Sequence, residues 1–151
     1  MPTITIRPYL AQDWPAIESI HDQSRKNELA LANLSDAFVP LKLAAVREGL
    51  FDDTVCVALI ENTVVGFVSY SQQELAWLYV DPSHARQGIG RQLIAYVLAH
   101  TGRPLHIEVL QGNQPALKLY QSMGFSVTET LSGVMPGNEA FAVTVHCLVK
   151  A

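Results

Sequence analysis

The chain has 151 residues, a formal net charge of −4 at pH 7 and no run of lysine and arginine longer than a pair. This length suits one ordinary domain with a real core, and the acidic balance disfavours a general nucleic-acid binder, which needs a basic face. No apolar stretch approaches the roughly 20 residues that span a bilayer, and the first residues do not resemble a signal peptide, so we expect a soluble, cytoplasmic protein. Cys56 and Cys147 each lie in an expected strand and are expected to be reduced, buried small hydrophobic residues.

The first half of the chain predicts a strand, a helix, an ambiguous stretch, a hairpin and a further strand. Residues 3–9 (TITIRPY) alternate apolar and polar side chains, as a half-buried strand does. Asp13 is placed to cap a helix, and residues 28–50 have a helical composition that Pro40 interrupts. Residues 54–70 predict a hairpin that turns near 61–63, and residues 74–80 (ELAWLYV) predict a strand.

The second half alternates helices and strands. Gly88 begins a helix that ends before Pro104, and residues 105–110 (LHIEVL) form a strand. Asn113 caps the next helix, which Gly124 ends. Residues 125–131 and 140–149 predict two last strands around a loop at 132–138 (SGVMPGN). Without a repeat or a linker, residues 1–151 are expected to form a single α/β domain.

The segment ARQGIGRQLI, residues 85–94, joins a strand to a helix through Gly88 and Gly90. A helix N-terminus offers free N–H groups and a partial positive charge, and glycine lets a ligand approach the backbone, so this turn predicts a phosphate site. A P-loop is excluded because Arg91-Gln92 stands where Lys-Ser/Thr is needed. The dinucleotide-binding motif G-x-G-x-x-G is incomplete, because Leu93 stands where its third glycine is needed. Glu108 nevertheless lies twenty residues after Gly88, where a ribose-binding acid is expected. A tight turn without a ligand is the third alternative.

Two segments, LYVDPSHARQGIGRQLI (78–94) and NQPALKLYQSMGF (113–125), together resemble the GNAT superfamily of acyl-CoA-dependent N-acyltransferases. The resemblance is strong over residues 64–131. It implies that the backbone of the glycine turn holds the pyrophosphate of coenzyme A, with these cofactor-binding residues: Arg86, Gln87, Gly88, Ile89, Gly90 and Arg91. Ala85 stands where the family prefers Gln or Arg, so we expect weaker cofactor affinity than a full motif gives.

The resemblance also implies that strand 74–80 separates from strand 105–110. The pantetheine amides would pair in the gap with the first strand, whose cofactor-binding residues are Leu78, Tyr79 and Val80. Asn113 would contact the pantetheine arm or a nearby water. From the residues alone Asn113 is a helix N-cap, and both roles can hold at once.

Tyr120 and Glu74 are the expected catalytic residues. Asn113 and Tyr120 are close to two helical turns apart, so both point the same way, about 10 Å from each other. By the resemblance, the Tyr120 hydroxyl faces the cofactor sulfur and stabilises the departing thiolate, whereas the alternative is a core aromatic residue. Glu74 matches the general base of some family members; alternatively it is a solvent-facing carboxylate and water chains remove the proton.

The sequence therefore predicts an α/β (α+β) GNAT-like fold with a mixed, mostly antiparallel sheet of six or seven strands, about four helices and a splayed central strand pair. The expected activity moves acetyl from acetyl-CoA to a primary amine of a small molecule or peptide. Direct attack is expected because neither cysteine lies near the motif. The five histidines show no ligand spacing, so no metal is expected, and no nucleic acid or membrane is expected as a partner. A homodimer is possible, as in many relatives. A nucleotide-dependent oxidoreductase and a CoA-binding regulatory module without turnover stay open.

Overall fold

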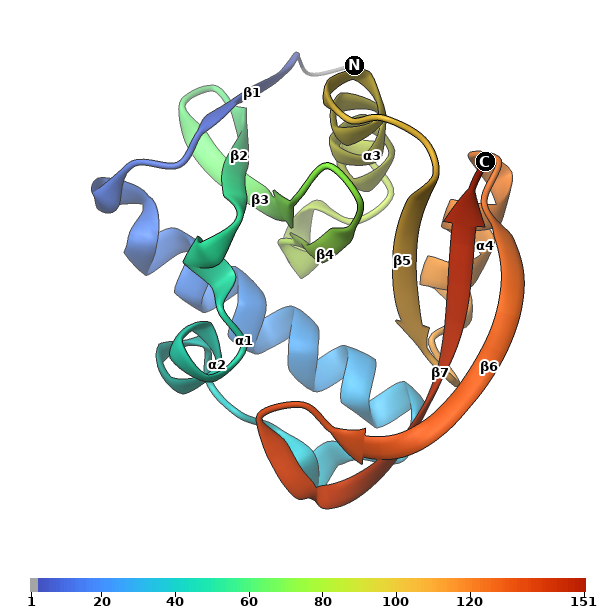
Figure 1. The fold of residues 1–151 in the computed structure, drawn as a ribbon. Helices are drawn as coiled ribbons and strands as arrows, with labels where there is room; N and C mark the ends of the chain where they lie inside the picture. Colours follow the sequence, from blue (N-terminus) through green and yellow to red (C-terminus); the bar gives the residue numbers. More distant parts are fainter. Residues whose placement is uncertain (1–2) are drawn as a thin grey trace.

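Seven strands and four α-helices make up the fold, seen in a computed structural model that describes residues 3–151 (Figure 1). The strands are β1 (Ile4–Pro8), β2 (Thr54–Ile60), β3 (Thr63–Tyr70), β4 (Leu75–Val80), β5 (Leu105–Leu110), β6 (Ser126–Met135) and β7 (Asn138–Lys150). The helices are α1 (Trp14–Leu31), α2 (Leu41–Arg47), α3 (Ile89–His100) and α4 (Gln114–Ser122). The predicted fold class is confirmed.

The strands divide into two antiparallel sheets, one in the order β1-β2-β3-β4 and the other in the order β5-β7-β6. The sheets touch at one end of the adjoining strands, through a parallel bridge between Glu74 and His106. There His106 N–H donates to the carbonyl of Gln73 over 2.8 Å. Beyond this point β4 and β5 diverge (Figure 1), so the expected splayed strand pair is present.

Helices cover both faces of the first sheet, and the alternation along β2 shows how the residues are divided between them. Val55, Val57 and Leu59 pack toward α1 and α2, in a cluster with Ile17, Ile20 and Leu41. Cys56 and Ala58 point the other way, into the larger cluster that α3 and α4 close with residues such as Leu93 and Tyr120. A third cluster joins the C-terminal end of α1 to the β6–β7 hairpin through Leu29, Leu110 and Met135. No helix within residues 3–151 is both long and apolar enough to cross a membrane.

The predicted loop at 132–138 is wrong, because the last two strands continue through most of it. β6 reaches Met135 and β7 begins at Asn138, so only Pro136 and Gly137 turn the chain, with Gly137 at φ +75°. Pairing persists past Gly133, whose φ is not positive, and a hydrogen bond of 2.9 Å joins the hydroxyls of Ser132 and Thr144. Turn-forming residue types misled the sequence analysis here, since cross-strand pairing outweighs their local preference.

Two smaller expectations also need correction. Asp13 precedes α1 but does not cap it: its carboxylate accepts from the Arg7 guanidinium at 2.8 and 3.0 Å and from Leu10 N–H at 2.8 Å. It therefore ties the helix start to β1. Cys147 is half-buried on β7, not buried like Cys56, although both cysteines are free.

Candidate active site

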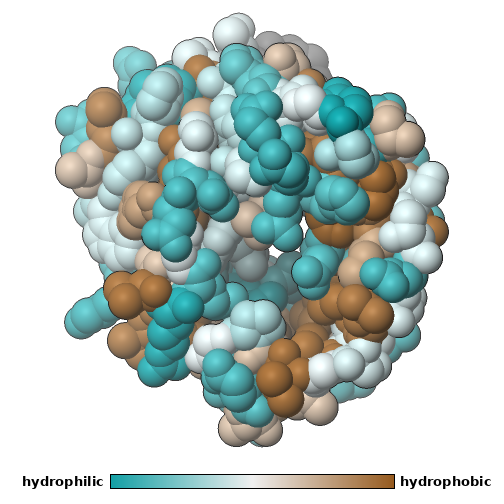
Figure 2. Space-filling model, in the orientation of Figure 1, coloured by the Kyte–Doolittle hydropathy of each residue, from teal (hydrophilic) through white to brown (hydrophobic). Residues whose placement is uncertain are grey.

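A cleft of about 450 Å³ opens where β4 and β5 part. The face shown in Figure 2 is hollowed near its centre, in the region between β4 and β5 of Figure 1. Side chains of α1, β4, β5, α4 and the β6–β7 hairpin line it, among them His21, Glu28, Tyr79, Glu108, Asn113 and Tyr120. The cleft is therefore lined both by the backbone of two diverging strands and by polar side chains of a helix.

The glycine turn at the start of α3 has the backbone of an anion site. Arg86 and Gly88 both have positive φ angles, +63° and +79°. The first hydrogen bond of the helix runs from Gln92 N–H to the Gly88 carbonyl at 3.0 Å, so the preceding N–H groups at 89–91 have no partner within the helix. Successive N–H groups in such a turn form a concave nest for a phosphate.

Gly90 has a packing reason to lack a side chain. A Cβ built there would lie 3.3 Å from Cδ2 of Leu119 on α4 and 3.9 Å from Cγ2 of Val80 on β4. The first turn of α3 thus lies close to α4 and to the end of β4. At Gly88, by contrast, an added Cβ would meet nothing within 4 Å, so the positive φ alone favours glycine. The backbone of the turn is therefore open to an anionic group.

The predicted side chains of the turn are in different surroundings. Arg86 is exposed and Gln87 is half-exposed. Arg91 is exposed, but its guanidinium donates to the Ser122 hydroxyl at 2.9 Å and so links α3 to α4. Arg86 and Gln87 therefore lie at the surface beside the turn.

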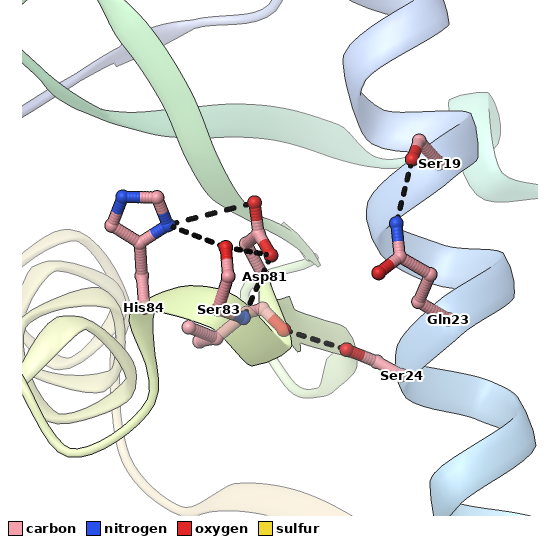
Figure 3. Close-up of polar contacts among 7 residues, drawn as sticks. Ser19, Gln23, Ser24, Asp81, Ser83 and His84 are labelled. Carbon is pink, nitrogen blue, oxygen red and sulfur yellow. Dashed lines mark hydrogen bonds and ion pairs between the residues drawn. The ribbon is translucent and has the colours of Figure 1, made fainter.

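The backbone of β4 presents alternate residues to the gap. Asp81 N–H donates to the Val65 carbonyl of β3 at 2.8 Å, so strand alternation turns the backbone groups of Leu78 and Val80 toward the gap instead. One of these groups already has a partner: the Ser24 hydroxyl of α1 donates to the Val80 carbonyl at 2.6 Å (Figure 3).

Just beyond β4, the Asp81 carboxylate holds the turn that leads to the glycines. It accepts from the backbone N–H of Ser83 at 2.9 Å and from its hydroxyl at 2.8 Å, and His84 lies beside them (Figure 3). These contacts fix the entry into the glycine turn.

Glu28 of α1 connects the two sides of the cleft. Its carboxylate accepts from the Tyr79 hydroxyl of β4 at 3.3 Å, from the Asn113 amide at 3.1 Å and from the Arg25 guanidinium. Asn113 is also the N-cap of α4, where its side-chain oxygen accepts from Ala116 N–H at 3.4 Å. The N-cap role of Asn113 is therefore present, and its amide group already has a protein partner.

Tyr120 lies at the wall of the cleft with 6% of its surface exposed, and its ring meets Phe125 edge-on at 5.6 Å. Burial raises the pKa of Tyr120 far above the ordinary value, and the nearby Glu28 charge raises it further. The hydroxyl consequently stays protonated, in the state that can donate a hydrogen bond.

The carboxylates of Glu74 and Glu108 lie near the end of the cleft where the two sheets touch. Glu74 is exposed, yet partial burial of its carboxylate raises its pKa, and the charges of Glu108 and Asp53 add to this, while His106 opposes it. A raised pKa brings Glu74 closer to the range in which a carboxylate accepts protons near neutrality.

Three residues of the cleft had no role in acetyl transfer predicted from the sequence. Glu108 was considered only as a ribose-binding acid, yet it faces the cleft between buried Ile107 and Val109 of β5. His21 and Glu28 were not assigned, although 21, 25 and 28 follow helical spacing and mark a polar face on α1. That spacing was the available signal. Within residues 3–151 no group of three or more His, Cys, Asp or Glu side chains is arranged to hold a metal ion.

A central strand pair parts beside a glycine-rich helix start, and a buried tyrosine lies in the gap. This arrangement suits a transferase with an extended, phosphate-bearing donor. Residues 51–127 match the family model described as an acetyltransferase (GNAT) domain, and this match covers about half of the chain. The chain belongs to the GNAT family.

Known proteins agree with this assignment. The peptidyl-lysine N-acetyltransferase YiaC of Escherichia coli is 39% identical over 70 residues, a match that spans 46% of this chain and 47% of YiaC. The match thus spans about half the length of that relative. The structure of YjaB from Escherichia coli superposes with a TM-score of 0.76 at 22% identity, covering 99% of this chain and 98% of YjaB. A Salmonella typhimurium acetyltransferase, yncA, solved with its cofactor acetyl-CoA, has a TM-score of 0.66 at 20% identity over 97% of this chain and 92% of its own. The two structures show the shared fold.

Proposed function

We propose that the protein transfers the acetyl group of acetyl-CoA to a primary amine by direct attack of the amine on the thioester. The observation that carries this proposal is the gap between β4 and β5, which Tyr120 lines and beside which Gly90 of the glycine turn packs close to Leu119 and Val80. Family membership and the acetyl-CoA bound to yncA support the donor. A dinucleotide is disfavoured because Leu93, a fully buried residue of α3, stands where the third glycine of the dinucleotide-binding motif is needed.

The residues present fit coenzyme A. The N–H groups of the α3 start are placed for the pyrophosphate, and Arg86 and Gln87 stand beside them. The gap-facing backbone of Leu78 and Val80 would pair with the pantetheine amides as an added strand does. Tyr79, held by Glu28, and Asn113 would then border the arm.

The acceptor must lose a proton before it can attack. An alkylamine with a pKa near 10.4 needs about 4.6 kcal/mol to become neutral at pH 7, whereas an α-amine near 8 needs about 1.4 kcal/mol. We assign Glu74 as the base, supported by its position in the cleft and by a pKa that partial burial raises and the neighbouring Glu108 charge raises further.

Tyr120 would stabilise the departing thiolate. Even an ordinary phenol, with a pKa near 10, is a weaker acid than a thiol near 8.5, so complete proton transfer is uphill by about 2 kcal/mol. Because burial raises the pKa of Tyr120 further, a strong hydrogen bond with late proton transfer fits this residue better than early transfer does.

A lysine side chain is the acceptor we favour. YiaC is named a peptidyl-lysine acetyltransferase, and the side of the cleft away from the glycine turn has apolar walls for an alkyl stem, formed by Trp77, Val143 and Val145. The carboxylates of Glu74 and Glu108 lie in the same cleft to meet an ammonium group.

The test is release of free thiol from acetyl-CoA with a panel of lysine peptides, peptides with free N-termini, amino acids, polyamines and aminoglycosides. The proposal expects turnover with lysine peptides and tighter calorimetric binding of acetyl-CoA than of NAD(P). Binding of acetyl-CoA without thiol release by any amine would identify a regulatory module instead. Preference for NAD(P) would identify an oxidoreductase.

A further inference from the structure

His21 is a buried titratable residue in the cleft that the mechanism above does not use. It lies on α1, is 2% exposed and lines the cleft. Its Nδ1 is 2.9 Å from Oδ1 of Asp22. The same Oδ1 accepts from Leu41 N–H at 2.9 Å, at the start of α2, so the carboxylate is itself held in place. The pair has the arrangement of a histidine oriented by a carboxylate.

The second ring nitrogen opens to the cleft. The ring packs edge-on against Tyr79 at 4.9 Å and lies 5.9 Å from Trp77. No hydrogen bond joins Nε2 to any residue of 3–151, and in this part of the chain no fully buried side-chain nitrogen or oxygen lacks a partner, so Nε2 must reach the open space of the cleft. With the Nδ1 proton donated to Asp22, the neutral ring presents a free lone pair at Nε2.

We propose that His21, oriented by Asp22, is a second proton acceptor for the acetyl transfer, taking one of the two protons that the acceptor nitrogen loses. This inference rests on the proposed function. A primary ammonium carries three hydrogens on nitrogen and the amide product carries one. The C–N bond forms and the C–S bond breaks; one proton ends on the sulfur, through Tyr120, and one leaves to solvent. Glu74 receives the first proton, before attack, and releases it to solvent. Nε2 of His21 receives the second as the C–N bond forms, and this proton returns through water to the Tyr120 oxygen, which gives its own proton to the sulfur.

The charges around the ring agree with this role. Asp22, Arg25 and Glu28 face it from α1 and Tyr79 faces it from β4; Glu48, after α2, and Glu74 lie farther along the cleft. Burial lowers the pKa of His21, while Asp22 and Glu28 oppose that shift and Arg25 reinforces it. A lowered pKa keeps the ring neutral at pH 7, which is the state that accepts a proton.

The test is chemical rescue. His21→Ala leaves space beside Trp77 and Tyr79, and we expect kcat with a lysine peptide to fall about 100-fold, within the range for loss of a general base. Added imidazole should restore kcat at least 10-fold in a saturable manner, with unchanged affinity for acetyl-CoA. His100→Gln is the matched control, since that exposed ring also has a fixed Nδ1, bonded to the Tyr96 carbonyl at 2.7 Å outside the cleft. It should keep wild-type kcat and show no response to imidazole.

Asp22→Asn is the second variant, which keeps an acceptor for Nδ1 and for Leu41 N–H but removes the charge. Because Asp22 raises the pKa of His21, its replacement should move the acidic limb of kcat to lower pH and reduce kcat by about tenfold. A folded His21→Ala protein with near wild-type kcat, or one that imidazole fails to rescue, would overturn the inference. If His21→Ala does not fold, an acidic limb of kcat in Asp22→Asn that lies at the same pH as in the wild type would also overturn the inference. If the wild type itself releases no thiol with any amine, the proposed function fails instead.

Discussion

Replacing Tyr120 with phenylalanine removes one oxygen from the cleft wall and leaves the packing in place. The ring is 6% exposed and meets Phe125 edge-on, and both features survive in Tyr120→Phe. No residue of 3–151 hydrogen-bonds the hydroxyl, so the free energy of unfolding should change by less than about 1.5 kcal/mol. Acetyl-CoA affinity should change little, because the hydroxyl acts on charge that develops only as the thiolate leaves.

The expected loss is therefore in kcat. Removing one well-placed donor to a developing anion lowers the rate by about 10²–10³, or roughly 3–4 kcal/mol. The assay is thiol release under saturating acetyl-CoA, with calorimetry for the affinity. Tyr96→Phe is the control, a half-buried tyrosine on α3 whose hydroxyl contacts Cys56 at 3.8 Å, away from the cleft. If kcat of Tyr120→Phe stays within a few-fold of wild type, the donor role is wrong and Tyr120 is only a packing residue.

Three further changes test other parts of the site. Glu74→Gln should lose most activity near pH 7 and recover as pH rises and free amine forms. In the wild type, base function is lost as pH falls through the raised pKa of Glu74; a pH–rate profile of the variant should lack this contribution and keep only the one from His21. Gly88→Ala should fold with about 1–2 kcal/mol less stability, measured by urea unfolding, because φ is +79° while an added Cβ meets nothing within 4 Å. Ala85→Arg, at an exposed position before the turn, should tighten acetyl-CoA binding by roughly 1 kcal/mol in calorimetry; unchanged affinity would mean that Arg86 already serves the phosphate.

Local patterns were sufficient for most of the fold. Apolar alternation located the strands of the β2–β3 hairpin, and the turn at Glu61 and Asn62 lies where it was expected, with both residues at positive φ. Gly88 and Asn113 located the starts of α3 and α4, because a helix start depends on a few neighbouring residues. The separation of β4 from β5 came from the family resemblance alone, since no local pattern encodes a missing strand contact.

The polar network of the cleft was not predictable in this way. Glu28 and Asn113 are 85 residues apart in sequence, and Ser24 and the Val80 carbonyl are 56 apart. The polar face of α1 is legible as helical spacing, but that pattern alone describes a solvated face equally well. Only the packing of α1 beneath the gap between the sheets makes this face part of the site.

Glu28→Gln tests whether that network holds the cleft together. The Glu28 carboxylate accepts from three donors, on Arg25, Tyr79 and Asn113. A glutamine offers one oxygen, and its NH2 group would face a donor, so at least one donor loses its acceptor and Arg25 loses its countercharge. Unpaired groups of this kind lower stability by about 1–3 kcal/mol, and the matched control Glu18→Gln, half-exposed on the same helix, should change it by less than about 0.5 kcal/mol. Urea unfolding of both variants measures the difference, and equal stabilities would show that the carboxylate does not tie α1 to the two walls.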